Sequence, residues 1–137
     1  MDRTETILFA QDLLIEFVQK WIRYDQLKTQ AEANEYYAAK DKIKNFLAGV
    51  PVEDMNATVQ IIGKVFDELD INNPDHARIN KSLFHAIDVA CKERLICLCC
   101  WKCSLESVQP QENEVKRWRC KECGKDYAEV CAMGRVV

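Results

Sequence analysis

Glycine, proline and histidine are scarce in this sequence, and their scarcity excludes several kinds of active site. Four glycines and three prolines in 137 residues form no glycine-rich phosphate-binding loop and no dinucleotide fingerprint. The two histidines, His76 and His85, form no His-Glu-x-x-His or His-x-Glu motif. A di-iron bundle needs Glu-x-x-His pairs, but Asn73 and Ser82 stand at that offset. We therefore expect no enzyme activity.

Long apolar runs are also lacking, and the first residues do not have the pattern of a secretory signal. The longest apolar run, residues 95–101, is far shorter than the roughly 20 residues that span a bilayer. Asp2 and Glu5 precede the first apolar cluster, whereas a secretory signal begins with a positive region. We expect an intracellular protein, in the cytoplasm or the nucleus, with reduced cysteines and no membrane contact.

Neither half of the chain carries a strong excess of positive charge. The net charge of −3 divides into −4 for residues 1–92 and +1 for residues 93–137. Binding to nucleic acid through bulk charge is therefore not expected, least of all for the acidic half.

Helical periodicity dominates the first two-thirds of the chain. From Thr4 to Leu47 there is no glycine or proline, and apolar residues recur at helical spacing. The segment Thr29–Asn34 could hold a turn between two helices or be the middle of one long helix, which would favour a homodimer to cover its far half. Further helices are expected over residues 53–69 and up to about Glu93. Their aromatic residues are interpreted as core, and an exposed Tyr36–Tyr37 pair would instead suggest a partner surface.

Two Cys-x-x-Cys pairs separated by sixteen residues predict a metal site. The pairs Cys100–Cys103 and Cys120–Cys123 can point four thiolates at one ion, the closed tetrahedral shell that structural zinc prefers. Cys97 offers a competing pair with Cys100. We prefer Cys103, because Ser104 would then follow the second ligand and is a more usual turn residue than Trp101.

The remaining cysteines have no assigned role in this interpretation. Free cysteines are often small buried apolar residues, which is the simplest account of them. A second metal site or redox sensing are the alternatives. These residues are Cys91, Cys97, Cys99 and Cys131.

The second pair and its surroundings resemble a zinc ribbon. Trp118 precedes Cys120 by two positions, Gly124 follows Cys123, and Tyr127 comes three residues later. The resemblance implies one structural Zn²⁺ held by a small β module. We therefore expect a mainly α fold, with a helical bundle over residues 1–94 and a zinc ribbon over residues 95–137.

Zinc ribbons occur in transcript-cleavage factors and RNA polymerase subunits. The resemblance therefore implies that this chain could bind a complex of that kind. The cleavage factors carry an adjacent Asp-Glu pair at the hairpin tip. Here the acids of the tip, Glu112 and Glu114, are separated, and we interpret them as solvated loop charges.

Basic residues on the expected second strand form a candidate contact with phosphate or with a protein partner. Strand alternation places Arg117 and Arg119 on the face opposite Trp118 and Cys120, and so outward. The same cations could simply offset the −2 charge of a Zn²⁺ with four thiolates. The candidate contact residues are Lys116, Arg117, Arg119, Lys121 and Lys125.

Three hypotheses of function follow. The preferred one is a non-catalytic zinc-binding regulator that docks on a nucleic-acid-handling complex, in transcription above all. The alternative is a protein-binding adaptor or inhibitor in which zinc is purely structural. The third is an iron–thiolate redox protein, which uses the same four cysteines.

Overall fold

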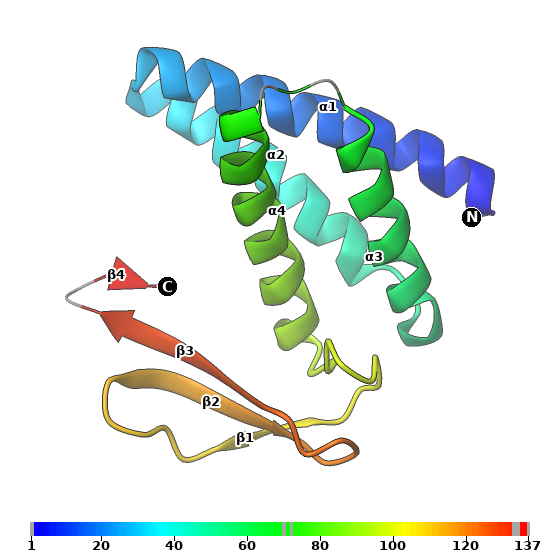
Figure 1. The fold of residues 1–137 in the computed structure, drawn as a ribbon, viewed down its shortest axis with the longest axis vertical. Coiled ribbons are helices and arrows are strands. Elements are labelled where there is room, and N and C mark those ends of the chain that lie inside the picture. Colours follow the sequence, from blue (N-terminus) through cyan, green and yellow to red (C-terminus); the bar gives the residue numbers. More distant parts are fainter. Residues whose placement is uncertain (1, 70, 72, 133–134, 137) are drawn as a thin grey trace. The chain divides into compact units, whose positions relative to one another are not determined.

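Four helices precede a small antiparallel sheet in the computed structural model, which describes residues 2–69, 71, 73–132 and 135–136 (Figure 1). The predicted mainly α fold is thereby confirmed. The sheet has the strand order β1-β2-β3-β4, and β4 adds only two residues to its edge. The elements are α1 (Arg3–Leu27), α2 (Gln30–Ala48), α3 (Val52–Asp67), α4 (Asn73–Glu93), β1 (Leu105–Val108), β2 (Glu114–Cys120), β3 (Asp126–Ala132) and β4 (Arg135–Val136).

The chain divides into two compact units, Met1–Ala90 and Cys91–Val137. The division falls inside the last turn of α4, whereas the sequence placed the boundary after residue 94. In the part of the chain that the structure describes, no helix has both the length and the apolar character needed to cross a bilayer.

Two helices, not one, occupy the segment from Thr4 to Leu47. Lys28 adopts a left-handed conformation (φ 53°), and its N–H donates to the carbonyl of Tyr24 at 2.8 Å. Thr29 then caps α2, because its hydroxyl accepts a hydrogen bond from the N–H of Glu32 at 3.2 Å. The break therefore lies at the start of the Thr29–Asn34 segment.

The helical core lies where α1 packs on α2 and α3, and α4 adds further buried side chains. Tyr36 of α2 is buried, and its hydroxyl is hydrogen-bonded to Ser82 of α4. Tyr37 is exposed, so the two tyrosines do not form the exposed pair that would suggest a partner surface. The largest fully buried side chains of this core are Leu14, Phe17, Ile43, Leu47, Met55, Ile62, Phe66, Ile79 and Leu83.

The end of α4 leads directly into the cysteines. Leu95 takes a left-handed conformation (φ 57°), and the N–H of Ile96 reaches back to the carbonyl of Cys91 at 2.8 Å. This is the usual way to close a helix and reverse the chain. Ile96 then forms an isolated antiparallel bridge with Cys103 within the second unit.

The central strand of the sheet is β2, which pairs antiparallel with both β1 and β3. Its inward residues, Trp118 and Cys120, are buried as predicted. Opposite them, Leu105 pairs with Cys120 and Tyr127 pairs with Trp118. The small core of this unit therefore contains Cys120, one of the predicted metal ligands.

Candidate metal centre

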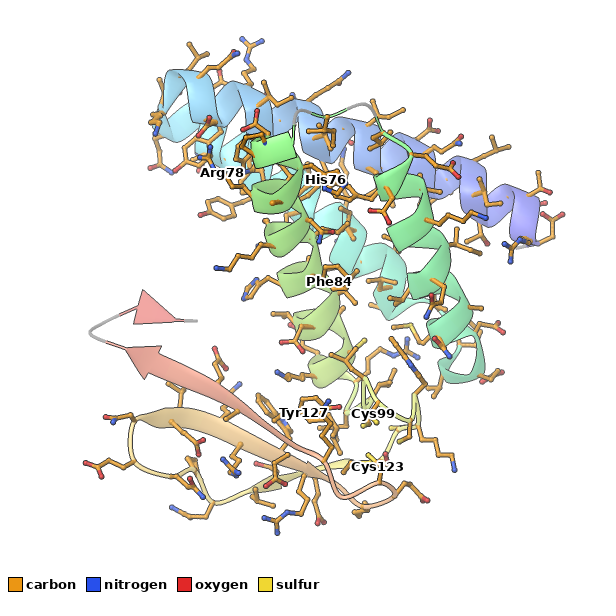
Figure 2. All side chains as sticks on the ribbon, in the orientation of Figure 1. His76, Arg78, Phe84, Cys99, Cys123 and Tyr127 are labelled. Atoms are coloured by element: carbon orange, nitrogen blue, oxygen red, sulfur yellow. The ribbon has the colours of Figure 1, made fainter. Side chains whose placement is uncertain are left out.

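Four cysteine thiols from two turns meet beside the sheet. Cys97 and Cys100 follow α4, and Cys120 ends β2. Cys123, labelled in Figure 2, lies in the turn to β3. All four Sγ atoms lie within 4.8 Å of one another, with 3.7 Å between Cys97 and Cys123 and 3.5 Å between Cys100 and Cys120. Sulfurs bonded to a tetrahedral Zn²⁺ at about 2.3 Å are about 3.8 Å apart. The four thiols therefore fit a closed zinc shell.

The two turns have the same hydrogen-bond pattern. In the first, Cys97 donates its N–H to the carbonyl of Lys102 at 3.0 Å and accepts at its own carbonyl from Trp101 at 2.7 Å. In the second, Cys120 donates to Lys125 at 2.9 Å and accepts from Gly124 at 3.0 Å. Each turn also aims an N–H at the sulfur of its first cysteine, at 3.3 Å and 3.4 Å. Two equivalent turns thus supply two ligands each.

Cys103, the first-pair ligand preferred from the sequence, is not a member of the group, and Cys97 takes its place. Cys103 lies beyond the turn, on the segment that returns past Ile96. Its side chain is exposed, and its Sγ donates to the carbonyl of Arg94 at 3.3 Å. The sequence interpretation disfavoured the pair Cys97–Cys100 because Trp101 would follow it in the turn. Trp101 nevertheless takes the left-handed backbone conformation there (φ 60°).

Ser104, which was expected to be the turn residue, instead contacts the ligand sulfurs. It is buried, and its hydroxyl lies 3.0 Å from the Sγ of Cys120 and 3.6 Å from that of Cys100. The hydroxyl of Tyr127 lies 3.2 Å from the Sγ of Cys97. Such outer hydrogen bonds orient thiolate ligands and temper their charge.

Hydrogen bonds lower the pKa of the first thiol in each turn, Cys97 and Cys120. Burial alone would raise the pKa of the Cys120 thiol, but hydrogen bonds from Ser104 and the turn N–H groups outweigh it and lower the pKa to about 6. For Cys97, burial is likewise outweighed by hydrogen bonds from Tyr127 and its turn, and the pKa is lowered. Metal ligation requires deprotonated thiols, so these groups favour it.

The donor set restricts what the centre can do. Four sulfurs close the tetrahedral shell, so no coordination position remains for water or substrate. Soft thiolates select zinc or iron and disfavour magnesium and calcium. A metal bound here would hold the two turns together and thereby stabilise the sheet unit.

The two arginines of the candidate contact face are engaged within the chain. Arg117 is partly buried and pairs with Glu114 at 2.7 Å and with Asp126 at 2.9 Å. Arg119 also pairs with Asp126, at 2.9 Å. These contacts raise the pKa of both arginines through their hydrogen bonds to Asp126. Both arginines therefore lie on the face opposite Trp118 and Cys120, but they are held by carboxylates of the same chain, and Glu114 is no solvated loop charge.

The three lysines of the candidate face are exposed. Lys116 follows a bulge at Val115, where the register of β2 against β3 shifts by one residue. Lys121 lies in the second cysteine turn, and the Nζ of Lys125 lies 5.7 Å from the ring centre of Tyr127. Among the described residues, neither Lys116 nor Lys121 has a carboxylate partner.

The other cysteines do not form a second group within the described part of the chain. Cys91 is buried at the end of α4, in agreement with the apolar interpretation. Cys99 is exposed in the first turn (Figure 2). The side chain of Cys131 lies outside the described residues.

The four-cysteine group beside a small antiparallel sheet agrees with a zinc-ribbon-like module. Comparison of the chain with protein-family models, with curated proteins and with solved structures gave no match. The likeness to a ribbon therefore rests on the two equivalent turns and the sheet that carries them.

Serine substitutions at Cys97 and Cys103 test the ligand set. Cys97→Ser removes a ligand and should weaken zinc affinity at least about a hundredfold, since losing even an outer-shell contact costs 10- to 100-fold. Cys103→Ser should leave the affinity unchanged. Competition titration against a chromophoric chelator measures both. The reverse ranking of the two variants would return Cys103 to the site.

A glycine exchange tests the turn geometry. Trp101→Gly should stabilise the zinc-loaded sheet unit by about 1 kcal/mol, because it relieves a left-handed non-glycine residue. Gly124→Ala should cost a similar amount, since φ is 78° and no atom lies within 4 Å of the added Cβ. Denaturant unfolding of the zinc-loaded protein checks the pair. Destabilisation by Trp101→Gly would mean that the indole packing outweighs the backbone term.

Proposed function

We propose that this chain is a non-catalytic zinc-binding regulatory or adaptor protein, which acts by binding a protein partner. The observation that carries the proposal is the closed four-thiol group, which leaves no open position for chemistry on a substrate. Zinc then stabilises the fold of the sheet unit, and the surfaces of the protein bind the partner.

The charge arrangement supports a protein partner over direct contact with nucleic acid. Phosphate binding draws on cations that exchange counterions for phosphates. Arg117 and Arg119 already share Asp126, and Arg117 also holds Glu114. The helical half has a net charge of −4, which repels a polyanion.

Docking on a nucleic-acid-handling complex, in transcription above all, is the second candidate. The exposure of Lys116, Lys121 and Lys125 favours it. These lysines lie on or next to the β2–β3 hairpin and could meet phosphates while the rest of the chain binds protein. An iron–thiolate redox role is the third candidate, and metal analysis with an absorption spectrum separates it from zinc.

Charge reversal of two lysines separates the first two candidates. We expect the zinc-loaded protein to bind RNA and DNA oligonucleotides only weakly, with Kd above about 10⁻⁴ M at low salt. Affinity purification from the native host should recover the same proteins with the wild-type chain and with Lys116→Glu/Lys121→Glu. Both lysines are exposed and lack a carboxylate partner among the described residues, so the variant should keep its zinc and its fold.

A salt-dependent submicromolar affinity for nucleic acid that the double reversal abolishes would instead favour the second candidate. Lys64→Glu/Lys81→Glu, at two exposed lysines of the helical unit, provides a control with the same change of net charge.

Metal removal tests the structural role of zinc. Binding of structural zinc supplies on the order of 10 kcal/mol in small modules, and that free energy is folding free energy. Chelation should therefore unfold the sheet unit and leave α1 to α3 folded. Amide NMR spectra should lose the dispersed signals of residues 97–127 and keep those of residues 3–67. Unchanged signals for both sets after complete metal removal would contradict a structural role.

A further inference from the structure

Helix α1 exposes more large apolar side chains than any other described element. Five of the nine such residues in the described part of the chain belong to it. Leu8, Ile15 and Ile22 are 58%, 43% and 36% exposed, and Phe9 and Leu27 are the other two. The opposite face of α1 is buried against α2 and α3, so these residues are additional to the core.

Three of these residues form a straight stripe along α1. Leu8, Ile15 and Ile22 are spaced by seven residues, so successive members are offset by only about 20° around a helix. We call them the α1 stripe. The side chains that alternate with them are mostly uncharged, namely Thr4, Gln11, Gln19 and Gln26, with Asp12 as the exception. A solvent-facing helix surface usually has more charge than this.

A hollow lies at the C-terminal end of the α1 stripe. It is shallow and open to solvent, and it is lined by residues of α1 alone, namely Gln19, Lys20, Ile22, Arg23 and Gln26. Four of these residues stand at positions i, i+3, i+4 and i+7, beginning with Gln19. This is the set of four that receives a knob from a facing helix in knobs-into-holes packing.

We propose that two copies of the chain associate through α1, antiparallel, about a two-fold axis at Ile15. In this arrangement Ile15 meets its symmetry mate. Leu8 of each copy stands level with Ile22 of the other, because both lie seven residues from Ile15. Each Leu8 then enters the hollow beside Ile22, and both ends of the α1 stripe are covered at once.

Charges beside the stripe favour this direction. The N-terminal half carries the acids Glu5 and Asp12, and the C-terminal half carries Arg23. An antiparallel pair brings Glu5 close to Arg23 of the second copy, because both lie on the same side of the α1 stripe, whereas a parallel pair leaves them 18 residues apart along the helices. Arg23 is 62% exposed, and its contact with Glu32 uses only the Nε–H, so further donors remain for a second carboxylate.

One acid beside the stripe needs a local partner in the antiparallel arrangement. Glu16 comes near Asp12 of the second copy, where two carboxylates would repel. Within its own chain, Glu16 is held by Lys42 at 2.8 Å, which offsets that charge. A single pair of helices about 37 Å long makes a small interface, so we expect dissociation in the micromolar range.

The association is measured on the full-length zinc-loaded protein by sedimentation velocity over a concentration series. Ile15→Glu, at the centre of the α1 stripe, should raise Kd at least about tenfold, because it buries two like charges against each other. Leu27→Glu is the matched control: it lies on the same helix with similar exposure (53%) but about 120° around from Ile15. Its Kd should be unchanged. Circular dichroism checks that both variants keep their helices.

A photo-cross-linking amino acid at position 8 fixes the direction without relying on those variants. In a mixture of isotopically heavy and light chains, mixed cross-links should join position 8 to residues 19–26 of the other copy. Cross-links from position 8 to position 8 would overturn the antiparallel arrangement. A monomer at all concentrations, or a dimer as weakened by Leu27→Glu as by Ile15→Glu, would overturn the proposal.

Discussion

The sheet unit depends on four sulfur atoms that must be held at mutual contact. Its buried cluster consists of Cys97, Leu105, Trp118 and Cys120, and two of these four are candidate ligands. Core and candidate metal centre therefore overlap, and little apolar surface remains to stabilise the unit by burial alone. Ionised thiolates at 3.5–3.7 Å repel one another, and a cation bound between them would offset that repulsion.

The same constraint explains which parts of the centre were predictable. Cys120–Cys123 was identified because Gly124 occupies a position that needs a left-handed backbone, and its φ of 78° agrees. For the first turn, spacing alone could not choose between Cys97 and Cys103, since both stand three residues from Cys100. The choice followed residue preference, which Trp101 violates. A metal-bound turn can impose a backbone conformation that costs about 1 kcal/mol, because ligation supplies far more.

The helices were predictable for a different reason. Periodic burial is a property of many residues at once, so the core survives errors at single positions. The break between α1 and α2 depends on only a few residues. Thr29 followed three residues later by Glu32 is the pattern of a capping box, and it was the available indicator of a new helix start. Helix propensity could not show the break, since Lys28 is a good helix former that here leaves the helix by turning left-handed.

Strand alternation alone overestimated how many cations the face of β2 offers to other molecules. Alternation correctly separates Trp118 and Cys120 from the two arginines, but it says nothing of what lies on the neighbouring strand. Asp126 begins β3 directly opposite Arg119 and accepts from both arginines. Basic residues of the sheet unit are thus partly used to join β2 to β3. The exposed groups without such a partner, Lys116 on the sheet unit and the apolar side chains along α1, are where contacts with other molecules remain available.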